Sequence, residues 1–291
     1  MTPITEIPYK ENELLSAHTT FRVGGPAKKL YLPETGEQLI ALKKHFSETS
    51  VPALVVGNGS NLLFSDAGFD GCIIKLENNY SNIEINDTRI VAQAGAKLSR
   101  LAACARDENL TGMEFAAGIP GTVGGAVCMN AGAYGGEMKD IVEWVNVIEE
   151  DGTERKYSNA ELDFAYRHSA IGAGQIVESV CLKLFPGKRE EIAARMDELK
   201  EKRKEKQPLE YPSAGSTFKR PEGYFAGKLI EDSGLKGYRV GGAMVSEKHA
   251  GFVINYDHAT AQDICTLIKD VQRIVKEKQG VELTPEVKII V

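Results

Sequence analysis

Two glycine-rich stretches decide the fold expected for this chain: Gly57-Asn58-Gly59-Ser60-Asn61 and Gly118-Ile119-Pro120-Gly121-Thr122-Val123-Gly124-Gly125. The first follows an apolar run at residues 53–56, which predicts a strand. Glycine has no side chain, so consecutive backbone N–H groups in such a loop can closely approach a diphosphate. One loop alone is a weak signal, and a tight turn without a ligand fits it about equally well. Two loops, each flanked by apolar strands, favour a large phosphate-bearing cofactor gripped from both sides.

The glycine excess of the chain is concentrated around the second loop. Seven of the 29 glycines lie between residues 118 and 136, a density that predicts irregular backbone, because glycine weakens helix and strand interiors. The Walker pattern Gly-x4-Gly-Lys-Ser/Thr does not occur, which disfavours a P-loop NTPase.

Composition excludes several classes of function. The 291 residues include 35 basic and 41 acidic side chains, a net charge of −6, which argues against nucleic acid or an anionic membrane as the main partner. No window approaches the ~20 apolar residues of a membrane span, and the N-terminus lacks a signal-peptide pattern, so we expect a cytoplasmic protein. The five cysteines and five histidines show no metal-binding or disulfide spacing, and we assign no metal.

Helical and strand patterns alternate along the rest of the chain. Helices are predicted after a Thr35 capping box, at residues 98–108, at residues 188–206 with the stripe Ile192, Met196 and Leu199, and between Thr260 and Gly280. Strands are predicted at residues 72–76, 89–94, 175–185 and 287–291, and a hairpin at residues 141–157. We place the boundary between the two halves at residue 188.

Three side chains could carry chemistry, and their residue types alone leave each role open. Arg167, predicted to end a short helical segment, is either a surface charge or a bidentate carboxylate clamp. Ser216 lacks a Gly-x-Ser-x-Gly elbow, so a structural hydroxyl is the default interpretation. Glu286, between a proline and an apolar strand, is either solvent-facing or held for a purpose.

Several motifs in order give the chain a resemblance to a known family. They are residues 19–25 (Thr-Thr-Phe-Arg-Val-Gly-Gly), residues 57–63, residues 118–125 with 130–135, residues 164–167 (Phe-Ala-Tyr-Arg), residues 214–219 (Ala-Gly-Ser-Thr-Phe-Lys) and residues 285–287 (Pro-Glu-Val). Together they resemble the bacterial UDP-N-acetylenolpyruvoylglucosamine reductases, or UDP-N-acetylmuramate dehydrogenases, over nearly the whole chain. Residues 223–246 leave no room for the extra tyrosine-bearing loop of the longer subclass, so the resemblance is to the short subclass.

The resemblance implies an α+β fold. It implies an FAD-binding domain at residues 1–187, in two subdomains of about 1–77 and 78–187, and a C-terminal substrate domain at residues 188–291. It also implies non-covalent FAD, with NADPH as hydride donor, and reduction of the enolpyruvyl ether of UDP-N-acetylglucosamine enolpyruvate to UDP-N-acetylmuramate for peptidoglycan. The expected partner is this small-molecule substrate, with no nucleic acid, membrane or obligate protein partner.

The resemblance also assigns residues to roles. The implied catalytic residues are Ser216 as proton donor, with Arg167 and Glu286 polarising the substrate carboxylate. The implied substrate contacts are Tyr166, Lys206, Arg220 and His249. The implied FAD contacts are Gly57, Asn58, Gly59, Ser60, Asn61, Gly118, Ile119, Pro120, Gly121, Val123, Gly124 and Gly125.

Two rival functions remain at this point. One is an oxygen-using alcohol or sugar oxidase on the same flavin fold, which the combination of Arg167, Ser216 and Glu286 argues against. The other is a nucleotide-binding module without chemistry, which would be colourless when pure and unable to oxidise NADPH.

Overall fold

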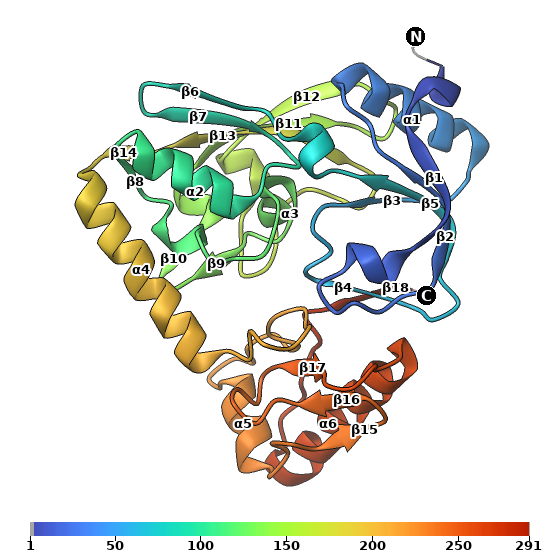
Figure 1. Cartoon of the computed structure of the whole chain (residues 1–291), viewed down its shortest axis with the longest axis vertical. Helices are drawn as coiled ribbons and strands as arrows, with labels where there is room; N and C mark the ends of the chain where they lie inside the picture. The colour runs from blue at the N-terminus through green and yellow to red at the C-terminus, as the bar shows by residue number, and fades with distance from the viewer. Residues whose placement is uncertain (1–2, 291) are drawn as a thin grey trace. The chain divides into compact units, whose positions relative to one another are not determined.

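Two units make up the chain, which the computed structural model describes from residue 3 to residue 290 (Figure 1). Unit 1 comprises the residues up to Glu11, Lys29–Asn58 and Gly71–Arg203. Unit 2 comprises Asn12–Lys28, Gly59–Asp70 and the chain from Lys204 onward. The domain boundaries expected at residues 77 and 187 stay predictions.

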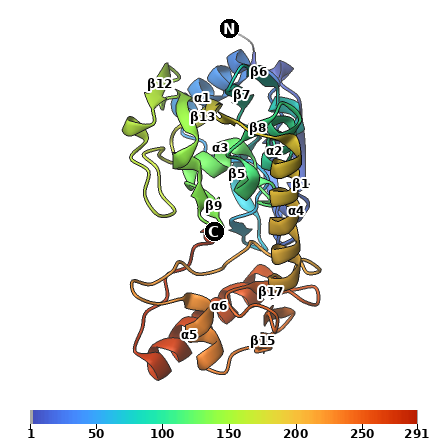
Figure 2. The ribbon, with the colours of Figure 1, turned by 90° about the vertical axis from the view of Figure 1, so that its left-hand side faces the viewer.

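A five-stranded antiparallel sheet forms the larger part of unit 1. Its order is β12 (Glu154–Ser158), β11 (Val142–Ile148), β13 (Ile176–Lys183), β7 (Arg89–Gln93) and β6 (Ile83–Asn86). Helix α2 (Leu98–Asp107) and the short helix α3 (Val123–Cys128) lie on one face of this sheet, as Figures 1 and 2 show. Valine and leucine side chains of β11 and β13 are buried there, among them Val145, Val180 and Leu182. Their burial supplies the main free energy that holds these layers together.

A second sheet has the order β1 (Tyr9–Leu14), β2 (Pro26–Tyr31), β5 (Phe69–Lys75) and β3 (Ala53–Val56). Helix α1 (Gly36–Thr49) connects β2 to β3, and the Thr35 side chain caps it by accepting from the Gln38 N–H. Strands β3 and β5 are parallel, with Val56 opposite Lys75. The glycine loop at residues 57–61 leaves β3 beside this last pair.

Unit 2 combines a small sheet, two helices and a strand pair. Its elements are β15 (Arg239–Val240), β16 (Ala243–Val245), β17 (Val253–Asn255), α5 (Ala226–Asp232) and α6 (Ala261–Gln279). Strand β18 (Lys288–Ile290) pairs in parallel with β4 (Leu62–Phe64). The core of the unit includes Phe21, Val23 and Leu63 from earlier segments of the chain. The C-terminal segment therefore does not build this core alone.

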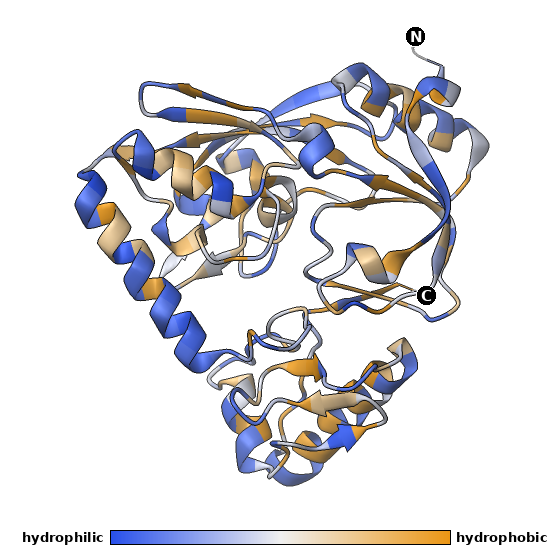
Figure 3. Cartoon of the chain, in the orientation of Figure 1, coloured by the Kyte–Doolittle hydropathy of each residue, from blue (hydrophilic) through white to orange (hydrophobic). Residues whose placement is uncertain are grey.

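The remaining elements are short or exposed. Helix α4 (Arg189–Lys206) is mostly hydrophilic, with apolar bands in its first half and a continuous hydrophilic stretch toward its end (Figure 3). The others are β8 (Leu110–Thr111), β9 (Gly132–Ala133), β10 (Gly136–Glu137), β14 (Phe185–Pro186) and the 3-10 turns η1 (Ile4–Glu6), η2 (Leu15–His18), η3 (Asn78–Tyr80), η4 (Glu114–Ala116), η5 (Met138–Asp140) and η6 (Ala160–Leu162). No helix among residues 3–290 is both long and apolar enough to cross a membrane.

Two sequence-based expectations were wrong. The glycine-rich stretch was expected to be irregular, but α3 forms inside it and includes Gly124 and Gly125. Packing explains this, because close approach to a neighbouring strand outweighs the low helix propensity of glycine. Residues 166–167 do not end a helix; they form a tight turn between Ala165 and His168. The predicted last strand is present as β18, while Val291 lies outside the described residues.

Candidate functional site

The two glycine loops are in contact within unit 1. The Asn58 side-chain amide donates to the Pro120 carbonyl across 3.0 Å. A side chain at Gly57 would overlap the hydroxyl of Thr122, which is buried. The two loops, which the sequence predicts to lie on either side of one ligand, are therefore in direct contact in the structure through residues 57–58 and 118–122.

The two glycines of α3 differ in what occupies the space where a side chain would lie. A Cβ atom at Gly124 would lie 2.8 Å from the Ala94 Cβ atom, so this position accommodates protein. Gly125 is exposed, and its Cβ would meet only the Thr122 hydroxyl, at an ordinary 3.7 Å. Of these two glycines, Gly125 is the one open to a ligand.

Lys75 lies buried beneath the first loop, with a side chain 3% exposed. Its ammonium donates to the Gly57 carbonyl across 2.5 Å and lies 3.5 Å from the Glu77 carboxylate. Burial lowers the pKa of Lys75 below its ordinary value, and the nearby Glu77 opposes this shift. The reasoning from sequence missed this lysine because it ends an apolar strand without belonging to any motif.

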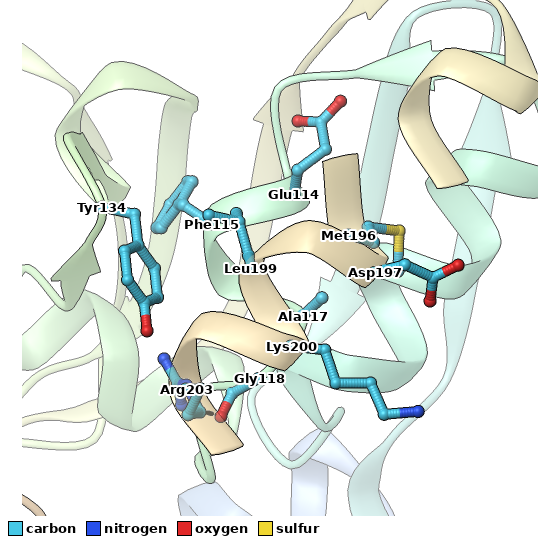
Figure 4. Close-up of a pocket in the computed structure, with 10 residues that line it drawn as sticks. All are labelled: Glu114, Phe115, Ala117, Gly118, Tyr134, Met196, Asp197, Leu199, Lys200 and Arg203. Atoms are coloured by element: carbon cyan, nitrogen blue, oxygen red, sulfur yellow. Dashed lines mark hydrogen bonds between the residues drawn. The ribbon is translucent and has the colours of Figure 1, made fainter. Parts of the chain in front are cut away.

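Arg203 plays a similar part at the second loop, as Figure 4 shows. The buried guanidinium donates to the Gly118 carbonyl and faces the Tyr134 ring, with 5.9 Å to the ring centroid. It lines a cavity of about 230 Å³ together with Phe115, Met196 and other residues. Burial lowers its pKa. A signal was available in the sequence, since Arg203 continues the helical stripe of Ile192, Met196 and Leu199.

Tyr166 and Arg167 occupy the tip of a two-residue turn in unit 1. The backbones of Ala165 and His168 exchange hydrogen bonds of 3.2 and 3.1 Å. The Asn130 side chain also donates to the Ala165 carbonyl, across 3.0 Å. Arg167 has φ of +54°, a region that non-glycine residues seldom adopt and that is often found at functional sites.

In unit 2 the structure brings Ser216 and Glu286 onto two paired segments. The Glu286 N–H donates to the Thr217 carbonyl across 2.8 Å, and Phe218 is bridged to Pro285. The Asn61 side chain donates to the Glu286 carbonyl across 3.1 Å. Ser216 is exposed next to the fully buried Thr217. A loop residue, the proposed proton donor and the proposed carboxylate thus lie together in this unit.

The other expected substrate residues are also in unit 2. Lys206 is exposed at the end of α4, and the Arg220 guanidinium lies 4.3 Å from the Phe225 ring centroid. The His249 Nδ1 atom accepts from the Gly251 N–H across 3.1 Å, and its ring packs against Phe252. Burial lowers the His249 pKa. The structure therefore gives His249 a role in holding its own turn, and its substrate contact stays a prediction.

The loop residues of unit 1 fit a bound diphosphate. In a trans peptide the carbonyl and the next N–H point in opposite directions, so the Asn58 N–H is directed away from Lys75. Within residues 3–290 this N–H has no hydrogen-bond acceptor. A free backbone donor, the exposed Gly125 and two buried cations beside the loops are features of an anion site. No group of His, Cys, Asp or Glu in the described chain could hold a metal ion.

Comparison with known proteins first defines the class. Residues 27–158 match the model of an FAD binding domain. Residues 207–290 match the C-terminal domain of UDP-N-acetylenolpyruvoylglucosamine reductase. A Phl p 4 variant described as a glucose oxidase shares 16% identity over 63% of this chain and 43% of its own, with a TM-score of 0.50, a likeness of fold alone. The chain is a flavin-dependent oxidoreductase with an α+β fold.

Full-length relatives then define the family. UDP-N-acetylenolpyruvoylglucosamine reductase of Caldanaerobacter subterraneus is 52% identical over 96% of this chain and 92% of its own length. The protein of that name from Limosilactobacillus reuteri is 51% identical over 100% and 97%. The crystal structure of the Thermus caldophilus reductase has a TM-score of 0.84 at 40% identity, covering 98% of this chain and 99% of that one. The chain belongs to the UDP-N-acetylenolpyruvoylglucosamine reductase family.

Membership confirms the expected activity at the level of the reaction. The enzyme uses FAD, with NADPH as reductant, and acts on a small molecule, UDP-N-acetylglucosamine enolpyruvate, in peptidoglycan synthesis. Which residues perform the individual steps is a separate question.

Proposed function

We propose that residues 57–61 and 118–125 bind the diphosphate of FAD, and that Ser216, Arg167 and Glu286 serve the reduction of the enolpyruvyl group. When bound at these loops, FAD would supply the transfer of hydride from NADPH to the terminal vinyl carbon of the substrate. The N–H of Asn58 and the open face at Gly125 support the placement of the diphosphate. The expected boundary between an FAD domain and a substrate domain at residue 188 is part of this proposal.

The chain must manage the negative charge that hydride addition leaves on the substrate. The carbon–carbon double bond is lost, and its electron pair moves toward the adjacent carbon and the carboxylate. Arg167 suits the carboxylate, because its planar fork can donate two parallel hydrogen bonds. Glu286 is proposed to polarise the substrate carboxylate together with Arg167 and so to stabilise the intermediate, and Ser216 transfers its hydroxyl proton to the carbon next to the carboxylate.

The observation that carries this assignment is the pairing of residues 217–219 with residues 284–286. Because the Glu286 N–H is bound to the Thr217 carbonyl, the segments bearing the hydroxyl and the carboxylate are fixed beside each other. Serine is a weak acid in water, so its alkoxide needs a neighbouring cation, for which Lys206 is the candidate. Tyr166, Arg220 and His249 are proposed to contact the UDP-sugar.

Single-turnover kinetics on Ser216→Ala tests the assignment. The bound flavin should still be reduced by NADPH, because that step needs no proton from Ser216. Its reoxidation by UDP-N-acetylglucosamine enolpyruvate should slow about a thousandfold, within the range that a general acid contributes. Ser213→Ala on the same segment is the control and should behave as the parent. If the flavin in Ser216→Ala were reoxidised at the parent rate, the Ser216 hydroxyl would have only a packing role.

The setting of the reaction follows from its reactants. We place it in the cytoplasm, where NADPH and nucleotide sugars are available. The net charge of −6 supports a function without nucleic acid or an anionic membrane surface. No obligate protein partner is part of the proposal.

A further inference from the structure

Lys75 is a buried cation with no place in the reaction described above. It ends β5 directly opposite Val56, the last residue of β3, and its ammonium reaches the carbonyl of the next residue, Gly57. A lysine buried to this degree is unusual in proteins, because removing the ammonium from water is costly. Its half-buried partner Glu77 has a second cation available, since the Lys97 ammonium lies 3.6 Å from it. The ion pair with Glu77 therefore does not by itself account for the burial of Lys75.

The contact with the Gly57 carbonyl fixes a peptide plane. Because the Gly57 carbonyl is directed at Lys75, the N–H of Asn58 is directed the opposite way. The Asn58 side chain is held as well, by its hydrogen bond to the Pro120 carbonyl on the second loop. The peptide between residues 57 and 58 is thus anchored on one side by a buried charge and on the other by the neighbouring loop.

We propose that Lys75 is a positioning residue for FAD, which orients the peptide between Gly57 and Asn58 so that the Asn58 N–H points at the diphosphate. Its positive charge, which lies beneath the loop and is screened little by solvent, also favours the anion at that place. Lys75 does not touch the diphosphate. This inference rests on the proposed function of the glycine loops.

Lys97 provides a matched control for Lys75. It carries the same charge and contacts the same Glu77, but its side chain is 45% exposed, and it occupies the N-cap position of α2 without a side-chain capping hydrogen bond. Lys75→Met keeps the approximate volume, removes the buried charge and leaves Glu77 paired with Lys97. Lys97→Met removes the corresponding charge and leaves the Gly57 carbonyl paired with Lys75. The two variants differ in whether the Gly57 carbonyl keeps its hydrogen bond and in how deeply the removed charge is buried.

Ligand competition on the full-length, FAD-stripped chain tests the proposal. The dissociation constants of FAD, ADP and adenosine are measured by flavin fluorescence and displacement. In Lys75→Met the constants for FAD and ADP should rise about ten- to a hundredfold, the range expected for a charge-linked hydrogen bond. The constant for adenosine, which lacks the diphosphate, should stay within about threefold of the parent, as should all three constants in Lys97→Met. At saturating FAD the reduction potential of the flavin should be unchanged.

Specific outcomes would overturn the inference. An equal weakening of all three ligands in Lys75→Met would indicate a loosened fold, and equal effects of the two lysine variants would indicate charge alone. If Lys75→Met is poorly folded, Lys75→Gln retains an amide donor for the Gly57 carbonyl and loses only the charge, so its FAD affinity should fall by less than about tenfold. Loss of FAD affinity in Gly125→Val, with no selective effect at Lys75, would reject the role of Lys75 and retain the loop site. Unchanged FAD affinity in both variants would reject the loop site itself.

Discussion

Arg167 combines a side chain of proposed catalytic function with a strained backbone. Its φ of +54° is held by the paired hydrogen bonds of Ala165 and His168 and by the Asn130 amide on the Ala165 carbonyl. Such strain persists where surrounding contacts determine the conformation, and it often serves to present a side chain. The turn therefore sets where the guanidinium is presented.

Arg167→Lys tests whether the geometry of this side chain is needed in addition to its charge. Lysine keeps the positive charge but cannot make the bidentate contact, so reoxidation of the reduced flavin by the enolpyruvyl substrate should slow about 10- to 100-fold. FAD content and reduction by NADPH should be retained. Stopped-flow absorbance of the flavin in each half-reaction provides the measurement. Reoxidation at the parent rate would show that the carboxylate is bound by another group.

At the scale of single elements, α3 shows two roles for adjacent glycines. Gly124→Val would place side-chain atoms against Ala94, so we expect destabilisation of about 1–3 kcal/mol, as for other overpacked cores. Gly125→Val has open space and should fold close to normally, yet it should lose FAD affinity if the cofactor lies against this face. Urea unfolding and flavin titration of both variants separate the two effects. Tight FAD binding by Gly125→Val would exclude the cofactor from this surface.

A second element-scale prediction concerns the stability of the central sheet at low pH. The Arg89 guanidinium on β7 donates twice to the Glu143 carboxylate on β11, across 2.7 and 2.8 Å, and so spans the intervening strand β13. The hydrogen bonds from Arg89 lower the pKa of Glu143 from 4.5 to about 2. A carboxyl group whose pKa is lowered on folding stabilises the fold above its unfolded pKa, and this contribution is lost as pH falls through the folded value.

The difference in unfolding free energy between the parent and Glu143→Gln should therefore be present at pH 6 and shrink between about pH 4.5 and pH 2. Urea unfolding at a series of pH values gives this difference directly. Glu84→Gln, at an exposed position on β6 of the same sheet, is the control. A difference that stays constant down to pH 2 would show that the ion pair contributes little.

The success of prediction from sequence also differed between elements. Helices with capping signals and apolar stripes were predicted close to their observed bounds. Helix α6, for example, begins after Thr260 and ends before Gly280 as expected. The glycine motifs correctly located both loops in the sequence, because a glycine pattern reflects the conformation that the local backbone requires. Lys75 was missed, since a buried cation outside any pattern is recognised only when the distant carbonyl it binds is known. Arg203 was overlooked although it continues the apolar stripe of α4. The hydrogen bond from Glu286 to Thr217 likewise depends on pairing between segments far apart in the chain.

At the scale of the whole molecule, unit 2 is assembled from three separate stretches of chain. Phe21, Val23 and Leu63 are each at most 4% exposed in its core. Burying three such side chains contributes roughly 5–9 kcal/mol, as large as the total stability of many domains. A fragment of residues 204–291 should consequently show no cooperative unfolding transition in urea and little dispersion in its amide NMR spectrum. A sharp transition in the isolated fragment would contradict this expectation.

The parallel pairing of β4 with β18 also determines when this part of the fold can form during synthesis of the chain. Asn61 and its partner Glu286 are 225 positions apart, which corresponds to roughly 10–45 s of synthesis at the usual speed of ribosomes. During that interval the apolar strand that follows Asn61 has left the ribosome, while its eventual neighbour has not yet been made. An unpaired strand of this kind is open to wrong partners. We therefore expect this strand to need protection, by chaperones or by earlier segments of the chain, until the last strand emerges.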